Sequence, residues 1–144
     1  MNIESTGFFK ISKNEIFDKI TRDFKRFIQS NSVLDLLDLV LWLRHLSEWI
    51  ELESDYGKEF IKTLNEKDSF KTLIGLSNRG KHHTLNRGKN VETTIAEGGQ
   101  VGLMQAGDMV GQDHFIVNGQ DIRLALNEVY NEYEDYFNKI KFET

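Results

Sequence analysis

The chain has 144 residues, of which 39% are hydrophobic and 11% aromatic, and this composition excludes an intrinsically disordered protein. Its formal net charge of -5 argues against a protein that coats DNA through many cationic contacts. The absence of cysteine excludes disulfides and thiolate metal sites. Since no segment resembles a signal peptide or a membrane span, we expect one cytoplasmic domain over residues 1–144 with no membrane association and no cofactor.

Five segments have the hydrophobic spacing of amphipathic helices, and these predicted helices cover roughly residues 12–30, 32–53, 55–66, 68–83 and 121–140. Ser12 is followed three residues later by Glu15, which is the capping-box pattern at a helix start. The second predicted helix is apolar on most sides at its beginning, so we expect it to be the most buried element. The last one carries an apolar stripe formed by Leu126, Val129, Tyr133, Tyr136, Phe137 and Ile140.

Most of the eleven glycines lie between Asn86 and Gly119, together with short β-branched runs such as "NVETTIA" and "HFIV". This pattern predicts an irregular β-ribbon over roughly residues 90–118. The Asn118-Gly119 pair favours a type I′ hairpin turn. The sequence therefore predicts a mainly α fold, a bundle of four to five helices with a glycine-rich β-hairpin or ribbon inserted before the C-terminal helix.

The stretch "LSNRGKHHTLNRGKN" concentrates four cations and two histidines without any acid. In one hypothesis His82 transfers protons near neutral pH, and Arg79 and Lys81 bind phosphate. Asn78 lies four residues before His82 and would orient a ribose hydroxyl, so this set would cleave RNA without a metal. The structural alternative is that these cations lie at a helix C-terminus because they complement its macrodipole.

A second polar set lies on the second predicted helix, where His45 and Glu48 occupy positions i and i+3 of one face. If the second and fourth helices pack antiparallel, both polar sets meet at one end of the bundle. A weaker hypothesis is a metal site built from His45, Glu48 and His82. The structural alternative is a buried His45 whose imidazole is oriented by Glu48.

The pieces "RHLSEW" (His45, Leu46, Glu48, Trp49) and "NRGKHH" (Asn78, Lys81, His82), with the closing "VNGQDIRLALNEVYNEYEDYF", resemble a family of small uncharacterised bacterial and phage proteins. That family is in turn similar to the HEPN superfamily of helical toxin and defence ribonucleases. The resemblance implies a homodimer, with the motif of each chain facing a shared cleft. HEPN ribonucleases carry Arg-x(4 to 6)-His, whereas here histidines follow Arg79 after two or three residues.

Two functions are therefore expected. The first is a HEPN-like dimeric protein, a possible ribonuclease, that binds or cleaves RNA or a nucleotide through His82, Lys81, Asn78, Arg79, His45 and Glu48. The alternative is a non-catalytic phage or mobile-element protein, an inhibitor or adaptor, that binds a host protein through the glycine-rich ribbon. The first requires an accessible cleft around His82. The second expects His45, Glu48 and Asn78 to be buried and hydrogen-bonded to one another.

Overall fold

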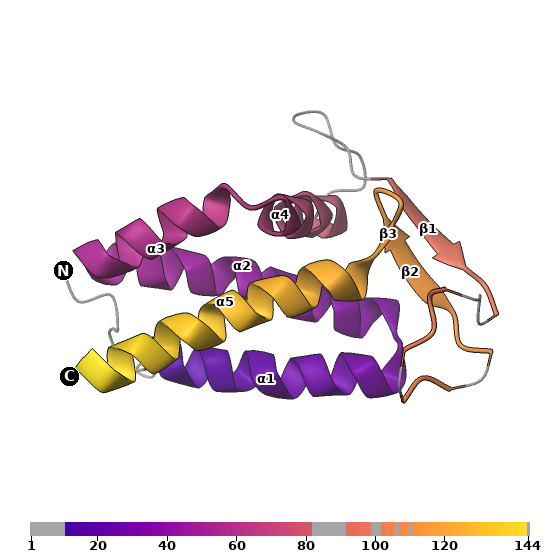
Figure 1. Ribbon diagram of the computed structural model, residues 1–144, viewed down its shortest axis with the longest axis horizontal. Coiled ribbons are helices and arrows are strands. Elements are labelled where there is room, and N and C mark those ends of the chain that lie inside the picture. Colours follow the sequence, from indigo (N-terminus) through magenta and orange to yellow (C-terminus); the bar gives the residue numbers. More distant parts are fainter. Residues whose placement is uncertain (1–10, 82–91, 99–101, 106, 110, 144) are drawn as a thin grey trace.

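The computed structural model describes residues 11–81, 92–98, 102–105, 107–109 and 111–143, with the backbone alone at residues 80, 81, 142 and 143. The described part contains five α-helices and one small β-sheet (Figure 1). The helices are α1 (Lys13–Ser30), α2 (Val33–Glu53), α3 (Asp55–Asn65), α4 (Asp68–Lys81) and α5 (Ile122–Glu143), and the strands are β1 (Thr93–Ala96), β2 (His114–Val117) and β3 (Gln120–Asp121). The predicted arrangement, mainly helical with a β-ribbon before the last helix, is confirmed.

The helix boundaries follow local capping chemistry. The Oγ atom of Ser12 accepts a hydrogen bond from the backbone N–H of Glu15 at 3.2 Å, so Ser12 caps α1 as the sequence predicts. Ser32 and Ser54 cap α2 and α3 in the same way. Helix α1 ends at Asn31, which adopts the left-handed conformation with φ 51°.

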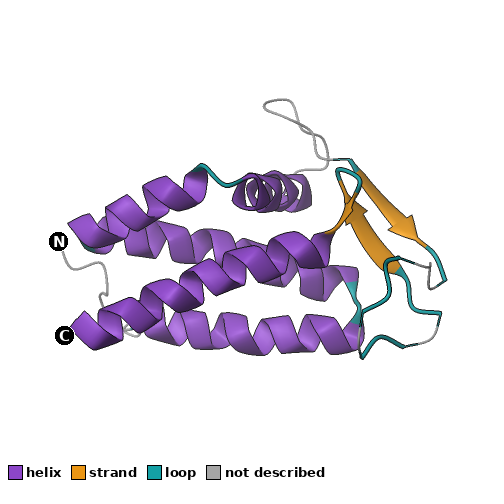
Figure 2. Ribbon diagram, viewed as in Figure 1, coloured by secondary structure: helices purple, strands orange, loops and turns teal. Residues whose placement is uncertain are grey.

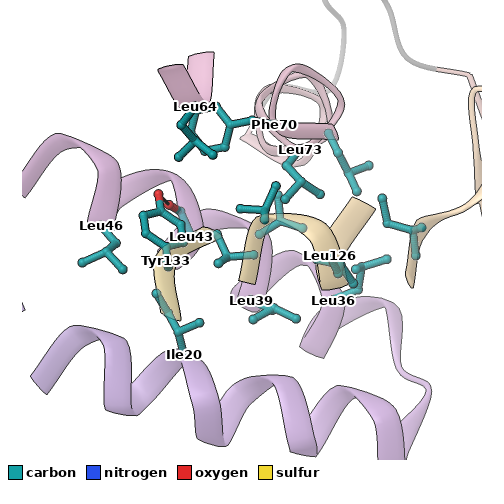
Figure 3. Packing of buried hydrophobic residues seen from close by; sticks show 14 of the residues in the cluster. Ile20, Leu36, Leu39, Leu43, Leu46, Leu64, Phe70, Leu73, Leu126 and Tyr133 are labelled. Atoms are coloured by element: carbon teal, nitrogen blue, oxygen red, sulfur yellow. Dashed lines mark hydrogen bonds between the residues drawn. The ribbon is translucent and has the colours of Figure 1, made fainter. Parts of the chain in front are cut away.

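Helix α2 is the central element, because it packs against α1, α3 and α4. Leu39, Leu43 and Leu46 of this helix are fully buried in the core (Figure 3). Helix α5 is fixed to it by Tyr133, whose buried hydroxyl donates a hydrogen bond to the carbonyl oxygen of Leu43 at 2.7 Å. Burial raises the pKa of the Tyr133 hydroxyl, which therefore remains a donor. Among the described helices, none has the length and apolar character needed to cross a membrane.

Helices α2 and α4 are in contact, but they do not pack antiparallel, which was the condition for the two polar sets to meet. Figure 1 shows α4 nearly end-on, while α2 lies along the long axis of the molecule. The reason is the connection: a single residue, Ser54, joins α2 to α3, so α3 and not α4 folds back along α2. Helix α4 then crosses the bundle, and only part of each helix contacts the other.

The sheet lies at the end of the bundle where α1 ends and α5 begins (Figure 2). It is antiparallel with the strand order β1-β2-β3, so β1 is an edge strand. A two-residue turn joins β2 to β3, with φ 51° at Asn118 and 82° at Gly119, as the predicted type I′ turn requires. The predicted ribbon stopped at residue 118 and missed β3, which is only two residues long.

Candidate functional site

No hydrogen bond or ion pair joins His45 or Glu48 to a described side chain of α4. His45 Nδ1 lies 3.6 Å from Glu48 Oε2, and the two side chains are 38% and 58% exposed. The His45 ring packs edge-on against Trp42 of the same helix. The expectation of a buried, hydrogen-bonded pair is therefore wrong, because both side chains are substantially exposed. The catalytic expectation for these two residues stays a prediction.

Arg44 makes the polar contact between α2 and α4 in place of His45. Its Nη1 donates to Ser77 Oγ at 3.0 Å and also to Asn78 Oδ1. Ser77 is buried and Asn78 half-buried. Because the Asn78 amide oxygen accepts a hydrogen bond from the Arg44 guanidinium, Asn78 links α4 to α2. The proposed role of Asn78 in orienting a ribose hydroxyl or the imidazole has no support from this geometry.

The remaining predicted residues are Arg79, Lys81 and His82. The side chain of Lys81 and all of His82 fall outside the described residues, so their predicted roles stay predictions. Arg79 is exposed and lines a pocket between the sheet and the helices. Within the described part of the chain there is no group of three histidines and carboxylates that could hold a metal ion.

This pocket has a volume of about 610 Å³ and lies between one face of the sheet and the helices. Its lining is Val33, Leu36 and Leu37 from α2, Leu76 and Arg79 from α4, Thr93, Thr94 and Ile95 from β1 with Glu97 beyond it, and Phe115, Ile116 and Val117 from β2. Most of these side chains are apolar, yet Ile95 is 51% exposed and Val33 48% exposed. The pocket is thus an open apolar depression beside an edge strand.

The register of the sheet determines which groups β1 presents at its open edge. The backbone N–H of Asn118 donates to the carbonyl oxygen of Glu92 at 2.9 Å, so these opposite residues form a hydrogen-bonded pair. Such pairs alternate along an antiparallel ladder, and the pairs Thr94–Ile116 and Ala96–His114 are therefore also hydrogen-bonded. The backbone N–H and C=O groups of Thr93 and Ile95 consequently point away from β2, toward the side of β1 that pairs with no described strand.

Side chains alternate between the two faces of this sheet. Thr93 and Ile95 lie opposite Val117 and Phe115 and share the face that forms the pocket. His114 and Asp121 belong to the other face, where both are buried. One face of the sheet is therefore open and apolar beside β1, and the other carries a buried ionic cluster.

We call the set Asp108, His114, Asp121 and Arg123 the ionic cluster. The Nε and Nη2 atoms of Arg123 both donate to the carboxylate of Asp121, with distances of 3.1 and 2.8 Å to Oδ2. Arg123 Nη1 donates to Asp108 Oδ1 at 2.7 Å, and Nη2 also contacts the carbonyl oxygen of Leu103. Asp108 and Leu103 belong to the glycine-rich connection between β1 and β2, so Arg123 fastens this connection to the start of α5.

The electrostatics of the cluster favour its charged forms. Hydrogen bonds from Arg123 to Asp121 raise the pKa of the guanidinium above its ordinary value, because they outweigh burial, which lowers it. Burial raises the pKa of Asp108, but the hydrogen bonds from Arg123 and from the Gln105 backbone outweigh it, and the net pKa is lowered. Both groups therefore remain ionised at neutral pH.

His114 completes the cluster with a defined tautomer. Its Nδ1 lies 3.0 Å from Arg123 Nη2, and a guanidinium can only donate, so Nδ1 carries the lone pair. In the neutral ring the proton is then on Nε2, which is buried without a hydrogen-bond partner in the described part of the chain. The imidazole acts as an acceptor that fixes the Arg123 side chain.

The sequence analysis missed both Arg44 and the ionic cluster. One local signal was available: Asp121 precedes α5 and its Oδ1 accepts from the backbone N–H of Arg123 at 2.9 Å, the behaviour of an N-cap residue. The contacts from Arg123 to Asp108 and Leu103 span 15 and 20 residues of glycine-rich sequence, and no spacing rule predicts them.

Comparisons with protein-family models, with curated proteins and with solved structures found no match to this chain. The resemblance to HEPN proteins therefore stays a prediction.

Proposed function

We propose that this protein is a non-catalytic binding protein that accepts an extended segment of a partner protein as an additional strand beside β1. The observation that carries the proposal is the open β1 edge, with the outward backbone groups of Thr93 and Ile95, next to an apolar pocket of about 610 Å³. An added strand gains affinity from main-chain hydrogen bonds, and pockets for alternate side chains supply specificity.

Two further observations support a binding surface at this end of the molecule. Exposed apolar side chains gather on the ribbon, namely Ile95, Met104 and Met109. The ribbon is also anchored, because Arg123 holds Asp108 and Leu103, and the side-chain amide of Asn31 donates to the carbonyl oxygen of Asp113 at 2.9 Å. Anchoring lowers the entropy cost of binding, since fewer residues must become ordered with the partner.

A selection from displayed random 12-residue peptides tests the proposal, with the immobilised protein as the target. Selected peptides are then synthesised and their affinities measured for wild type, Thr93→Pro and Thr93→Ala. Proline removes one outward N–H without touching the ladder to β2, whereas alanine keeps that N–H and removes only the side chain. Loss of that hydrogen bond together with the steric effect of the ring should weaken binding by about tenfold or more in Thr93→Pro.

The proposal predicts that Thr93→Ala binds the same peptides within about twofold of wild type, since only one exposed side chain changes. Both variants should unfold at the wild-type denaturant concentration, which shows that the sheet is intact. Failure to enrich any peptide, or equal binding by Thr93→Pro and wild type, would contradict strand addition at β1.

A second candidate, the HEPN-like RNA-binding or RNA-cleaving protein, is favoured by Arg79. This side chain is exposed and forms no ion pair with a described residue, so it is free to bind phosphate. We propose as its test the cleavage of labelled RNA in EDTA by wild type, His82→Ala and Lys81→Ala, with Lys71→Ala as an exposed control on α4. Activity lost only in folded His82 and Lys81 variants would establish a metal-independent site. An inactive wild type would remove this candidate.

A further inference from the structure

The charges that flank β1 limit which strand can be added there. Glu92 and Glu97 are exposed and stand immediately outside the two ends of β1. Neither forms an ion pair with a described residue, including Arg79, which lines the same pocket as Glu97. Within the described part of the chain, both carboxylates are thus unpaired beside the strand that an incoming segment would contact.

This arrangement disfavours pairing of β1 with a second copy of itself. In an antiparallel pair the outward backbone groups of Thr93 and Ile95 must face the outward groups of the copy, so the central registers place Ile95 opposite Ile95 or Thr93 opposite Ile95 of the copy. In these two registers no basic residue of the copy lies opposite Glu92 or Glu97, and two chains that each carry a net charge of -5 repel each other at long range. Charged residues at the ends of an edge strand are a known protection against self-association.

Side-chain alternation gives the complementary partner a definite pattern. By this alternation Glu97 lies on the same face as Thr93 and Ile95, and Glu92 lies on the opposite face. In an antiparallel partner strand, the residues opposite Glu97 and Glu92 are separated by four others and also point to opposite faces. The residues opposite Ile95 and Thr93 point toward the apolar pocket.

Resting on the proposed function, we infer that the partner of β1 is an extended segment of another protein with the pattern basic–any–apolar–any–apolar–basic. Its two apolar side chains enter the pocket beside Ile95 and Val33, and its Lys or Arg residues lie against Glu97 and Glu92. The net charge of -5 on the whole chain adds long-range attraction for a basic segment. Arg79 lines the same pocket as Glu97 and would repel a basic residue there. The preference for a basic partner therefore depends on Glu92 and Glu97 together.

The peptides selected as described above test this inference. They should be enriched in Lys and Arg at two positions five apart, with apolar residues in between. The double variant Glu92→Gln/Glu97→Gln should bind them about three- to tenfold more weakly at low salt, and the difference should disappear near 0.5 M NaCl, because these charges are exposed and screened. The matched control Glu51→Gln/Glu66→Gln removes the same charge from exposed sites on α2 and beyond α3, and should bind within about twofold of wild type.

The results separate this inference from the proposed function. Peptides that depend on the Thr93 N–H but lack basic residues, or that bind equally to the Glu92→Gln/Glu97→Gln variant, overturn the charge pattern and leave strand addition intact. Enrichment of acidic peptides through Arg79 overturns it as well. Peptides insensitive to Thr93→Pro overturn the proposed function itself. Self-pairing predicts that the wild-type protein dimerises and that the amides of Thr93 and Ile95 exchange more slowly as the protein concentration rises, without any peptide. That result would show that β1 pairs with a second copy and would overturn the inference.

Discussion

Arg123 is the residue on which the glycine-rich ribbon depends most. Its side chain is 7% exposed and bridges Asp121 and Asp108, so replacing it leaves two largely buried carboxylates without their counter-ion. We expect Arg123→Met to lower the free energy of unfolding by about 3–5 kcal/mol, since breaking one side of a buried ion pair costs about that much. Urea denaturation measures this. Arg22→Met, at an exposed position of α1, should change stability by less than about 0.5 kcal/mol. Equal stabilities of the two variants would contradict the role of Arg123.

The lowered pKa of Asp108 gives the cluster a pH dependence at the acid end. A carboxyl group with a lowered pKa in the folded protein stabilises it above the ordinary pKa, and this contribution is lost as the pH falls through the folded value. We expect Asp108→Asn to be less stable than wild type at pH 7, and the gap to narrow below about pH 4. Urea denaturation across pH 2–7 measures the gap. A gap that stays constant over this range would show that ionisation of Asp108 contributes nothing.

Residue identity alone could not predict which polar side chains lie inside. His45 and Glu48 have helical spacing, but their face of α2 is exposed, while the neighbouring Arg44 reaches α4 because its side chain is long. A long flexible side chain can contact a neighbouring element from a position that helical periodicity assigns to another face. The predicted site therefore lay one residue away from the contact that the fold uses.

At the scale of elements, the contact from Arg44 to Asn78 is the polar link between α2 and α4. A double-mutant cycle with Arg44→Met and Asn78→Ala should give a coupling of about 1–2 kcal/mol, as expected for a hydrogen bond to a charged donor in a partly buried site. The same cycle with His45→Ala and Glu48→Ala should give less than about 0.5 kcal/mol, because that pair is exposed and 3.6 Å apart. The reverse order of coupling energies would restore His45 and Glu48 as the structural pair.

Gly57 allows α3 to begin close to the end of α2. A Cβ atom at this position would lie 2.2 Å from the carbonyl oxygen of Ile50, which is backbone and cannot move aside. Helix propensity alone predicts that Gly57→Ala stabilises the protein by up to about 1 kcal/mol. We expect a net destabilisation of about 1–3 kcal/mol from the steric overlap. Thermal unfolding of Gly57→Ala measures this destabilisation, with Lys58→Ala, at an exposed position on the same helix, as the control. A melting temperature of Gly57→Ala above that of wild type would contradict this packing.

The elements themselves were largely predictable, because each has a local cause. Apolar spacing located the helices, the Ser12 capping box marked the start of the first one, and the Asn118-Gly119 pair indicated the hairpin turn. The crossing of α4 over α2 was not predictable in this way. It follows from the one-residue connection to α3 and from packing around the core, both of which are properties of the assembled chain.

At the scale of the whole molecule, the helical bundle positions a small sheet at one end with one edge open. The buried side of that sheet is held by the ionic cluster, and its other side forms the apolar pocket with α2 and α4. The sequence indicated a glycine-rich ribbon as a recognition surface, and strand addition at β1 is a specific form of that hypothesis. Which strand forms the edge depends on the pairing of β1 with β2, across the 17 residues between Ala96 and His114, and no local pattern encodes that pairing.

Amide hydrogen exchange along β1, followed by NMR with and without a selected peptide, tests the central claim most directly. Without peptide, the amides of Thr94 and Ala96 should exchange slowly and those of Thr93 and Ile95 quickly, because only the first pair donates to β2. With peptide, Thr93 and Ile95 should become protected while Thr94 and Ala96 remain so. Slow exchange at Thr93 and Ile95 before peptide is added, or no change at these two amides in the complex, would contradict strand addition at β1.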